Sequence, residues 1–119
     1  MKGFRDLKVW EKAHRLALSA YRSTRDFPSQ EQYGLSSQIR RAAVSIPTNI
    51  AEGCGRSSDA DFARFLDIAF GSASELEYLV HLCRELDLLK SETQVQLHGD
   101  VVEVKRMLSS LLQKLRADR

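Results

Sequence analysis

The feature that most constrains the fold of this chain is residues 38–56, which have the pattern of one amphipathic helix with a proline in its middle. Pro47 has no backbone N–H and its ring clashes with the preceding turn, which costs about 3 kcal/mol in a helix interior. Gly53 and Gly55 end the stretch and tolerate the positive φ that suits a helix C-cap. A chain that keeps such a helix must offset this cost by packing, so the segment predicts a helical fold with a close-packed core.

Apolar residues recur at intervals of three and four along four segments, which is the pattern of amphipathic helices. We expect these helices over about residues 5–26, 35–54, 59–88 and 91–116. Phe27-Pro28 ends the first helix, because the residue before a proline disfavours the helical region. Ser58, with Asp61 three residues later, has the outline of a capping box at the start of the third. The pattern predicts an all-α fold, an antiparallel up-down-up-down four-helix bundle, as one domain over residues 1–119.

The apolar face of the first predicted helix identifies the side chains that it is expected to bury. These are Leu7, Trp10, Ala13, Ala17, Ala20, Tyr21 and Thr24. The corresponding face of the second predicted helix consists of Leu35, Ile39, Ala42, Ala43, Ile46 and Ile50. On the third predicted helix, the run Gly71-Ser72-Ala73-Ser74 places four small residues together, which would let a neighbouring helix approach closely.

The composition places the chain among globular proteins without a membrane span. It is 43% apolar and 29% charged, and no apolar run approaches the roughly 18 residues that a transmembrane helix needs. The N-terminal residues are charged where a signal peptide has its apolar core. The two cysteines, Cys54 and Cys83, have neither zinc-site nor redox-motif spacing. We therefore expect a cytoplasmic protein with reduced thiols.

Charge is distributed unevenly along the chain, although the net charge is only +2. Residues 1–30 carry seven basic and three acidic side chains, a net charge of +4. Residues 57–90 carry three basic and seven acidic side chains, a net charge of −4. The first helix is thus expected to be basic and the third acidic, an asymmetry that favours a contact between these two surfaces.

One stripe of basic side chains lies on the first predicted helix, opposite its apolar face. It consists of Arg5, Lys8, Lys12, Arg15 and Arg22. The first four fall within an arc roughly 80° wide at 100° per residue. Such a stripe is either a solvated helix face or a surface that contacts the phosphates of a nucleic acid or a partner protein. The sequence shows neither an aromatic stacking platform nor a known reading motif beside it.

A line of polar residues runs along the edge of the second predicted helix. It consists of Gln38, Arg41, Ser45, Asn49 and Glu52, and Glu75 in the middle of the third helix is the expected partner of Arg41. The line is either a ligand cleft or a half-buried network that fixes the register of the two helices. We favour the structural network.

The third predicted helix carries a second apolar stripe away from its core face. Its members are Ile68, Phe70, Tyr78 and Leu82. A helix that is apolar on more than one side is fully buried or contacts a partner. We predict a subunit interface here, with the basic first helix of one copy against the acidic third helix of its neighbour. The alternative is that these charges neutralise each other within one bundle.

No constellation in the sequence indicates enzyme chemistry. His14, His81 and His98 fall on three different helices, without a carboxylate or a second histidine at ligand spacing. The run Gly53-Cys54-Gly55-Arg56 follows a helix, whereas phosphate loops follow a strand. We therefore predict no catalytic residue, no cofactor and no metal site.

Several motifs together resemble one protein family. They are Phe4…Leu7-x-x-Trp10, Phe27-Pro28-x-x-Glu31-x-Tyr33-Gly34-Leu35, Gln38-x-Arg40-Arg41-Ala42, Ser45-Ile46-Pro47-x-Asn49-Ile50-Ala51-Glu52-Gly53 and Gly71-Ser72-x-x-Glu75-Leu76-Glu77. The chain resembles the four-helix-bundle proteins encoded by intervening sequences of bacterial large-subunit rRNA genes, and is similar to the accessory variability protein of diversity-generating retroelements. The resemblance implies a ring-shaped homopentamer, and the retroelement members imply binding of nucleic acid and of a nucleic-acid-bound protein. The net charge of +2 is lower than in the basic members.

From the residues and the resemblance together we predict a non-enzymatic, self-associating helical scaffold or adaptor. Its basic face is a candidate for binding structured RNA, DNA or a nucleic-acid-bound protein. The alternative is a pure protein–protein interaction module, in which the charged stripes serve assembly alone.

Overall fold

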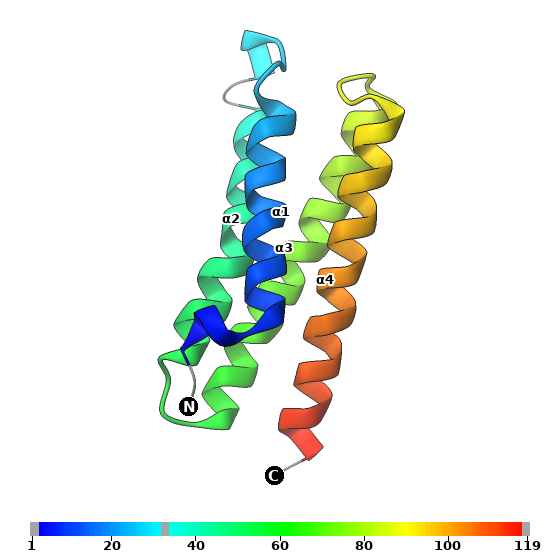
Figure 1. The fold of residues 1–119 in the computed structure, drawn as a ribbon. Coiled ribbons are helices and arrows are strands. Elements are labelled where there is room, and N and C mark those ends of the chain that lie inside the picture. Colours follow the sequence, from blue (N-terminus) through cyan, green and yellow to red (C-terminus); the bar gives the residue numbers. More distant parts are fainter. Residues whose placement is uncertain (1–2, 32–33, 118–119) are drawn as a thin grey trace.

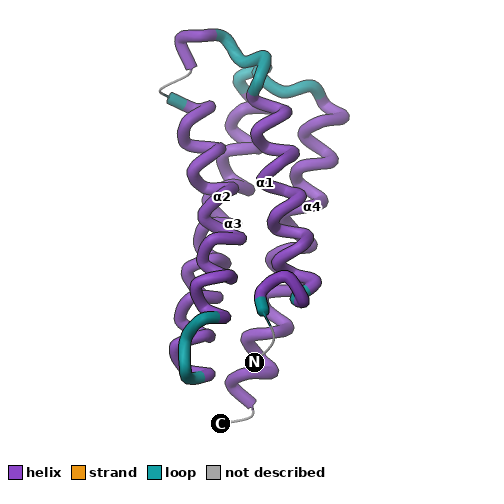
Figure 2. Tube along the Cα trace, turned by 60° about the vertical axis from the view of Figure 1, so that its left-hand side comes forward, coloured by secondary structure: helices purple, strands orange, loops and turns teal. Residues whose placement is uncertain are grey.

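The computed structural model describes residues 3–31 and 34–117 of the chain. These residues form an all-α, antiparallel four-helix bundle about 47 Å long (Figure 1). The helices are α1 (Lys8–Thr24), α2 (Leu35–Cys54), α3 (Asp59–Glu85) and α4 (Ser91–Ala117), with short 3-10 turns η1 (Phe4–Asp6) and η2 (Ser29–Glu31). Each helix packs against its neighbours in the chain, and α4 closes the bundle against α1 (Figure 2). The predicted fold class is confirmed.

The first helix begins later than the sequence pattern predicts. Leu7 has an extended backbone, with φ −88° and ψ 125°, and separates η1 from α1. The ring of Phe4 packs against Trp10 with 4.8 Å between the ring centroids. Aromatic packing therefore folds the N-terminal turn back onto α1, where the periodicity predicts a continuous helix from residue 5.

Helix α2 has the predicted bounds and runs unbroken through Pro47, whose side chain is buried. Two side chains that follow the proline donate hydrogen bonds to carbonyls of the preceding turn. Thr48 Oγ1 bonds the carbonyl of Val44 at 2.7 Å, and Asn49 Nδ2 bonds the carbonyl of Ser45 at 2.8 Å. These bonds supplement the backbone ladder where a proline weakens it, and burial among core residues offsets the rest.

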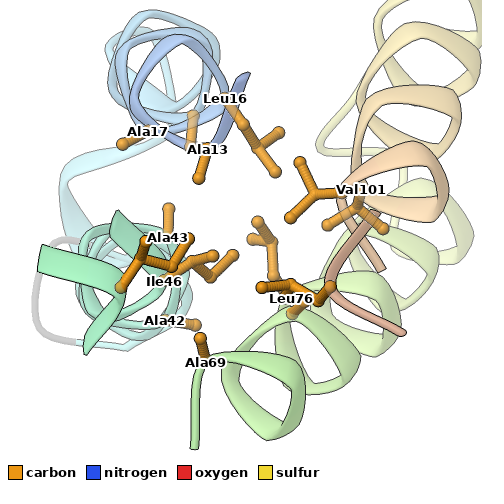
Figure 3. Close-up of a cluster of buried hydrophobic side chains, with 14 of the residues drawn as sticks. Ala13, Leu16, Ala17, Ala42, Ala43, Ile46, Ala69, Leu76 and Val101 are labelled. Carbon is orange, nitrogen blue, oxygen red and sulfur yellow. The ribbon is translucent and has the colours of Figure 1, made fainter. Parts of the chain in front are cut away.

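The core runs along the bundle axis, with small side chains where α2 meets its neighbours and larger ones on the side of α4 (Figure 3). Ala13 of α1 faces Ala43 of α2, and Ala42 of α2 faces Ala69 of α3, so small side chains hold α2 close to both neighbours. Larger side chains from α1, α3 and α4 converge in the remaining space, namely Leu16, Leu76 and Val101. Burying one such leucine contributes about 1.5–3 kcal/mol. Small side chains therefore set the close packing of α2 against α1 and α3.

Two assignments within the predicted core face of the first helix need correction. Tyr21 was predicted to be buried but is exposed, whereas Leu16 lies outside the predicted face and is almost completely buried. The buried side of α1 therefore faces more toward α4 than the predicted apolar face, which included Tyr21 and left out Leu16.

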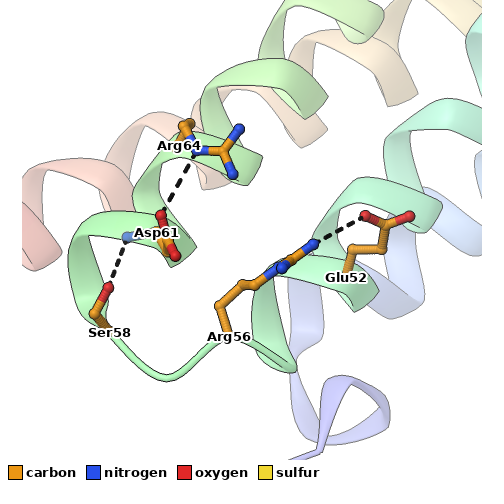
Figure 4. A network of polar contacts seen from close by, with 5 residues as sticks. All are labelled: Glu52, Arg56, Ser58, Asp61 and Arg64. Atoms are coloured by element: carbon orange, nitrogen blue, oxygen red, sulfur yellow. Dashed lines mark hydrogen bonds and ion pairs between the residues drawn. The ribbon is translucent and has the colours of Figure 1, made fainter.

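The turn between α2 and α3 is built on close contact and capping (Figure 4). A Cβ atom at Gly53 would lie 2.8 Å from Cδ1 of Phe62, so the glycine permits close approach. None of the glycines in the described ranges has a positive φ, so the predicted C-cap conformation at Gly53 and Gly55 is not adopted. Ser58 Oγ accepts a hydrogen bond from the Asp61 amide at 3.1 Å, which confirms the predicted N-cap.

The third helix ends three residues earlier than predicted. Asp87 has a φ of 59°, and the amide of Leu88 donates to the carbonyl of Cys83 at 2.8 Å. This is the six-to-one hydrogen bond of a left-handed C-cap, with aspartate in the place that glycine usually takes. The cap directs the chain into a short turn before α4.

Candidate interaction surfaces

The basic side chains of α1 form one wall of a groove between α1 and α4. Lys8, Lys12, Arg15 and Arg22 line this groove, which has a volume of about 590 Å³. Asp100 and Glu103 come from the α4 side, and apolar lining comes from Leu16 and Met107. Arg5, the fifth predicted member, lies apart, with its guanidinium 4.6 Å from the ring centroid of Phe4. The structure therefore brings four of the five predicted basic residues together.

Acidic side chains of the same subunit partly neutralise this basic wall. Arg15 pairs with Glu11 one turn away at 2.7 Å. Arg106 donates hydrogen bonds that lower the pKa of Glu103, and the positive charge of Lys12 lowers that pKa further. Neutralisation within the bundle thus comes from α1 and α4, whereas the charge pattern of the sequence predicted α3 as the acidic partner.

Two residues of the predicted polar line, Ser45 and Asn49, take part in a hydrogen-bonded network between α2 and α3. Ser45 Oγ lies 2.8 Å from Ser72 Oγ, and Asn49 Nδ2 donates to Ser45 Oγ at 3.0 Å. Ser72 was not included in the predicted set, because its sequence context showed only a run of small residues. Glu52 lies outside this network and faces Arg56 at 3.8 Å (Figure 4).

The remaining polar residues line a groove of about 360 Å³ above this network. Gln38 and Arg41 contribute from α2, and Glu75 contributes from α3. Arg41 and Glu75 share this groove but form no ion pair within the described ranges 3–31 and 34–117. The pairing that the sequence suggested within one subunit is absent there, so both charges remain available.

The second apolar stripe of α3 is only partly covered. Ile68 and Tyr78 are exposed, and Leu82 is half-buried. Phe70 packs against the core instead, with Lys105 Nζ 5.1 Å from its ring centroid. We define the outer α3 stripe as the residues that follow one another at spacings of three and four along this side of α3. They are the exposed Ile68, Gly71, Glu75 and Tyr78, and the half-buried Leu82. Phe70 therefore belongs to the contact between α3 and α4.

The structure contains a further surface that the sequence analysis missed, an apolar groove of about 500 Å³ between α1 and α2. We call it the α1/α2 groove, and its principal lining residues are Phe4, Trp10, His14, Leu18, Tyr21, Val44 and Pro47. The ring of His14 stacks on Trp10 with 5.0 Å between the centroids. Leu18, Tyr21 and Val44 are exposed. The sequence signal that could have revealed this groove is the pair Leu18 and Val44, two isolated apolar residues on otherwise polar helix faces.

Arginine side chains surround the end of this groove near Tyr21. The guanidinium of Arg40 lies 4.9 Å from the Tyr21 ring centroid and donates to Thr24 Oγ1 at 2.9 Å. Arg22, in the last turn of α1, and Arg25, its C-cap residue, are exposed. Most of the groove is apolar, its end near Tyr21 is cationic, and Glu52, which also lines it, faces Arg56. The groove therefore suits an apolar segment that carries an acidic side chain toward the Tyr21 end.

Burial keeps the two cysteine thiols in their neutral, less nucleophilic form. Burial raises the pKa of the Cys83 thiol to about 11 and that of Cys54 above its usual value. His81 faces Glu85, one turn later, at 3.1 Å on the exposed side of α3, so the prediction that no histidine has a carboxylate at such spacing was wrong for this residue. Within residues 3–31 and 34–117, no three histidine, cysteine or carboxylate side chains are grouped so as to hold a metal ion.

The helices of the described residues lack the length of apolar sequence needed to cross a membrane.

Comparisons with known proteins agree with this fold. A comparison with curated protein sequences found no significant match. The chain is similar to a protein of unknown function from the S23 ribosomal protein family of Bacteroides thetaiotaomicron, known from a crystal structure at 1.70 Å resolution. The TM-score is 0.79 and the sequence identity 29%, over 87% of this chain and 97% of that chain. The family model described as 23S rRNA-intervening sequence protein matches residues 5–110, so this chain belongs to the 23S rRNA-intervening sequence protein family.

Proposed function

We propose that this protein is a non-enzymatic helical scaffold that acts in the cytoplasm by associating with copies of itself. The observation that carries the proposal is the presence of two separate, uncovered apolar surfaces on one small bundle. These are the α1/α2 groove and the outer α3 stripe. Exposed apolar surface of this kind on a small protein marks a contact with another protein.

Sedimentation velocity over a range of protein concentrations tests the self-association. The expected result is a mass well above the 13.5 kDa of the monomer. The resemblance to ring-forming relatives implies a fivefold assembly, and the measured mass decides this number. A chain that stays monomeric at every concentration would contradict the proposed function.

A second candidate function, binding of structured RNA, is favoured by the four basic side chains gathered along the α1/α4 groove. Repetition of this wall around an assembly would build a stronger cationic surface than one subunit provides. The name of the family refers to an rRNA intervening sequence, which makes a structured RNA the appropriate probe.

Fluorescence anisotropy with a labelled RNA hairpin tests this second function at about 50 and 200 mM salt. Binding through phosphate contacts should weaken steeply at the higher salt concentration, because bound cations are released less favourably. The double variant Lys8→Glu and Lys12→Glu should abolish it, whereas Lys90→Glu, at the turn before α4, should leave it intact. Absence of binding at low salt would leave a pure protein–protein interaction module as the function.

A further inference from the structure

The two uncovered apolar surfaces of this chain differ in shape and in charge. One is a groove between α1 and α2, and the other is a convex stripe along α3. We infer that the outer α3 stripe of one copy lies in the α1/α2 groove of a second copy. This inference rests on the proposed self-association and adds which two surfaces meet.

The dimensions of the two surfaces match those of a helix lying in a groove. From Trp10 to Tyr21 the groove follows α1 for about 16 Å, and from Ile68 to Leu82 the stripe extends for about 21 Å, at 1.5 Å per residue. Apolar anchors at spacings of three and four are the pattern by which helices dock into grooves. Gly71 lies within the stripe, and a Cβ atom there would meet no atom within 4 Å, so the backbone of α3 is open to close approach.

The aromatic lining of the groove complements the side chains of the stripe. Trp10 and Tyr21 lie toward opposite ends of the groove, with Leu18 and Val44 exposed between them. The stripe presents Tyr78, the most exposed of its large side chains, between smaller aliphatic ones. Aromatic pairs contribute about 0.5–1.5 kcal/mol beyond the burial of their area, so Tyr78 is the expected anchor.

Opposite charges on the two surfaces are unpaired within the subunit. The guanidinium of Arg40 lies at the Tyr21 end of the groove, 4.9 Å from the ring centroid, and forms no ion pair within residues 3–31 and 34–117. The same holds for Glu75, which lies within the stripe. Glu52 also lines the groove, but it faces Arg56 of the same subunit at 3.8 Å. Complementary charge orients an interface and opposes wrong pairings. A contact between copies therefore gives Arg40 and Glu75 the partners that they lack in one subunit.

Such a contact joins two different surfaces, so it is heterologous and leaves one free surface of each kind at the ends of a pair. This property distinguishes it from a symmetric dimer, in which one surface meets its own copy. It also provides a test by complementation.

Two substitutions block one surface each, and each has a matched control. Val44→Glu places a carboxylate in the groove, and Tyr78→Glu places one on the stripe. Val102→Glu and Val95→Glu add the same charge on the exposed side of α4, at similar exposures: 43% against 39% for Val44, and 66% against 61% for Tyr78. Each blocking variant should sediment as the 13.5 kDa monomer, and both controls should keep the mass of the unaltered protein. Circular dichroism establishes that all four variants are folded.

Mixing the two blocking variants gives the decisive result. The intact stripe of Val44→Glu should fill the intact groove of Tyr78→Glu, so an equimolar mixture should form a species of twice the monomer mass and no larger one. A mixture that remains monomeric, or controls that lose association as strongly as the blocking variants, would overturn the pairing of these two surfaces.

The outcomes separate this inference from the proposed function on which it rests. If the unaltered protein associates but Val44→Glu and Tyr78→Glu associate equally well, the pairing is wrong and self-association stands. If the unaltered protein is monomeric at every concentration, both are wrong. A groove that instead takes a helix of a different protein belongs to this second outcome.

Discussion

Gly53, near the end of α2, is required by side-chain packing and not by backbone conformation. Its φ is not positive, yet a Cβ atom would lie 2.8 Å from Phe62 Cδ1 and 3.0 Å from Phe65 Cβ. Phe65 is in turn held between the guanidinium groups of Arg56 and Arg64, each 4.6 Å from the ring centroid. The two aromatic rings therefore have little freedom to move aside.

Gly53→Ala should lower the free energy of unfolding by about 1–3 kcal/mol, the usual effect of overpacking, despite the better helix propensity of alanine. Gly99→Ala in α4 is the matched control, because a Cβ atom there meets no atom within 4 Å. That change should raise the free energy of unfolding by about 0.5–1 kcal/mol. Urea unfolding measures both, and shifts of the same sign would contradict the packing explanation.

The Cys83 thiol gives the stability a dependence on alkaline pH. Burial chiefly raises its pKa to about 11, from an ordinary value of 9.0 that the unfolded chain retains. The thiol is protonated in both states below pH 9, so its contribution to stability is complete there. As the pH rises from about 9 to 11, the unfolded state loses the proton first, and stability falls.

Urea unfolding between about pH 8 and pH 10.5 should therefore show a falling free energy of unfolding. The variant Cys83→Ala should show a shallower fall, although a cavity makes it less stable at every pH. The comparison concerns slopes, because lysine and tyrosine side chains also titrate in this range. Equal slopes would mean that Cys83 is not the source.

At the scale of the helices, apolar periodicity correctly predicted the four helices and their order along the chain. It was less accurate for the ends of those helices that begin or end in irregular backbone. Helix α2 has the predicted bounds, with Gly34 as its N-cap and Gly55 as its C-cap. The start of α1 depends on the extended backbone of Leu7, and the end of α3 on the positive φ of Asp87. Neither residue type demands that conformation, so tertiary packing decides both.

The N-cap of α3 distinguishes two adjacent serines, either of which the sequence alone would allow to cap the helix. Ser58 accepts the amide of Asp61, whereas Ser57 lies outside the helix. Ser58→Ala should lower the free energy of unfolding by about 1 kcal/mol, since the amide loses its partner. Ser57→Ala should change it by less than about 0.5 kcal/mol. Thermal unfolding of the two variants under identical conditions gives the comparison, and equal losses would reject Ser58 as the cap.

At the scale of the whole molecule, the sequence located charged and apolar stripes but not their neighbours. Lys8 and Lys12 were correctly placed on one side of α1, yet the opposing Asp100 and Glu103 belong to the far end of the chain. The α1/α2 groove was missed because Trp10 and Tyr21 fit a core period. Periodicity identifies the side of a helix that faces inward, but it does not determine how wide the buried arc is.

The proposed self-association and the proposed RNA binding are coupled, because the number of subunits in an assembly sets how many basic α1 surfaces it presents to one RNA. Val44 lies in the α1/α2 groove, while Lys8, Lys12 and Arg22 line the α1/α4 groove. Blocking association at Val44 therefore removes no basic side chain, yet it reduces a multivalent surface to a single one. Avidity from linked sites can exceed the affinity of one site by about 10²–10⁴.

Val44→Glu should accordingly weaken binding to a long structured RNA at least tenfold and reduce its dependence on salt, since fewer phosphates are contacted by each particle. Val102→Glu adds the same charge and should bind as the unaltered protein does. A short hairpin that spans one subunit should bind Val44→Glu and Val102→Glu equally, because one wall suffices for it. Equal binding of the long RNA by both variants would show that the basic walls act independently of assembly.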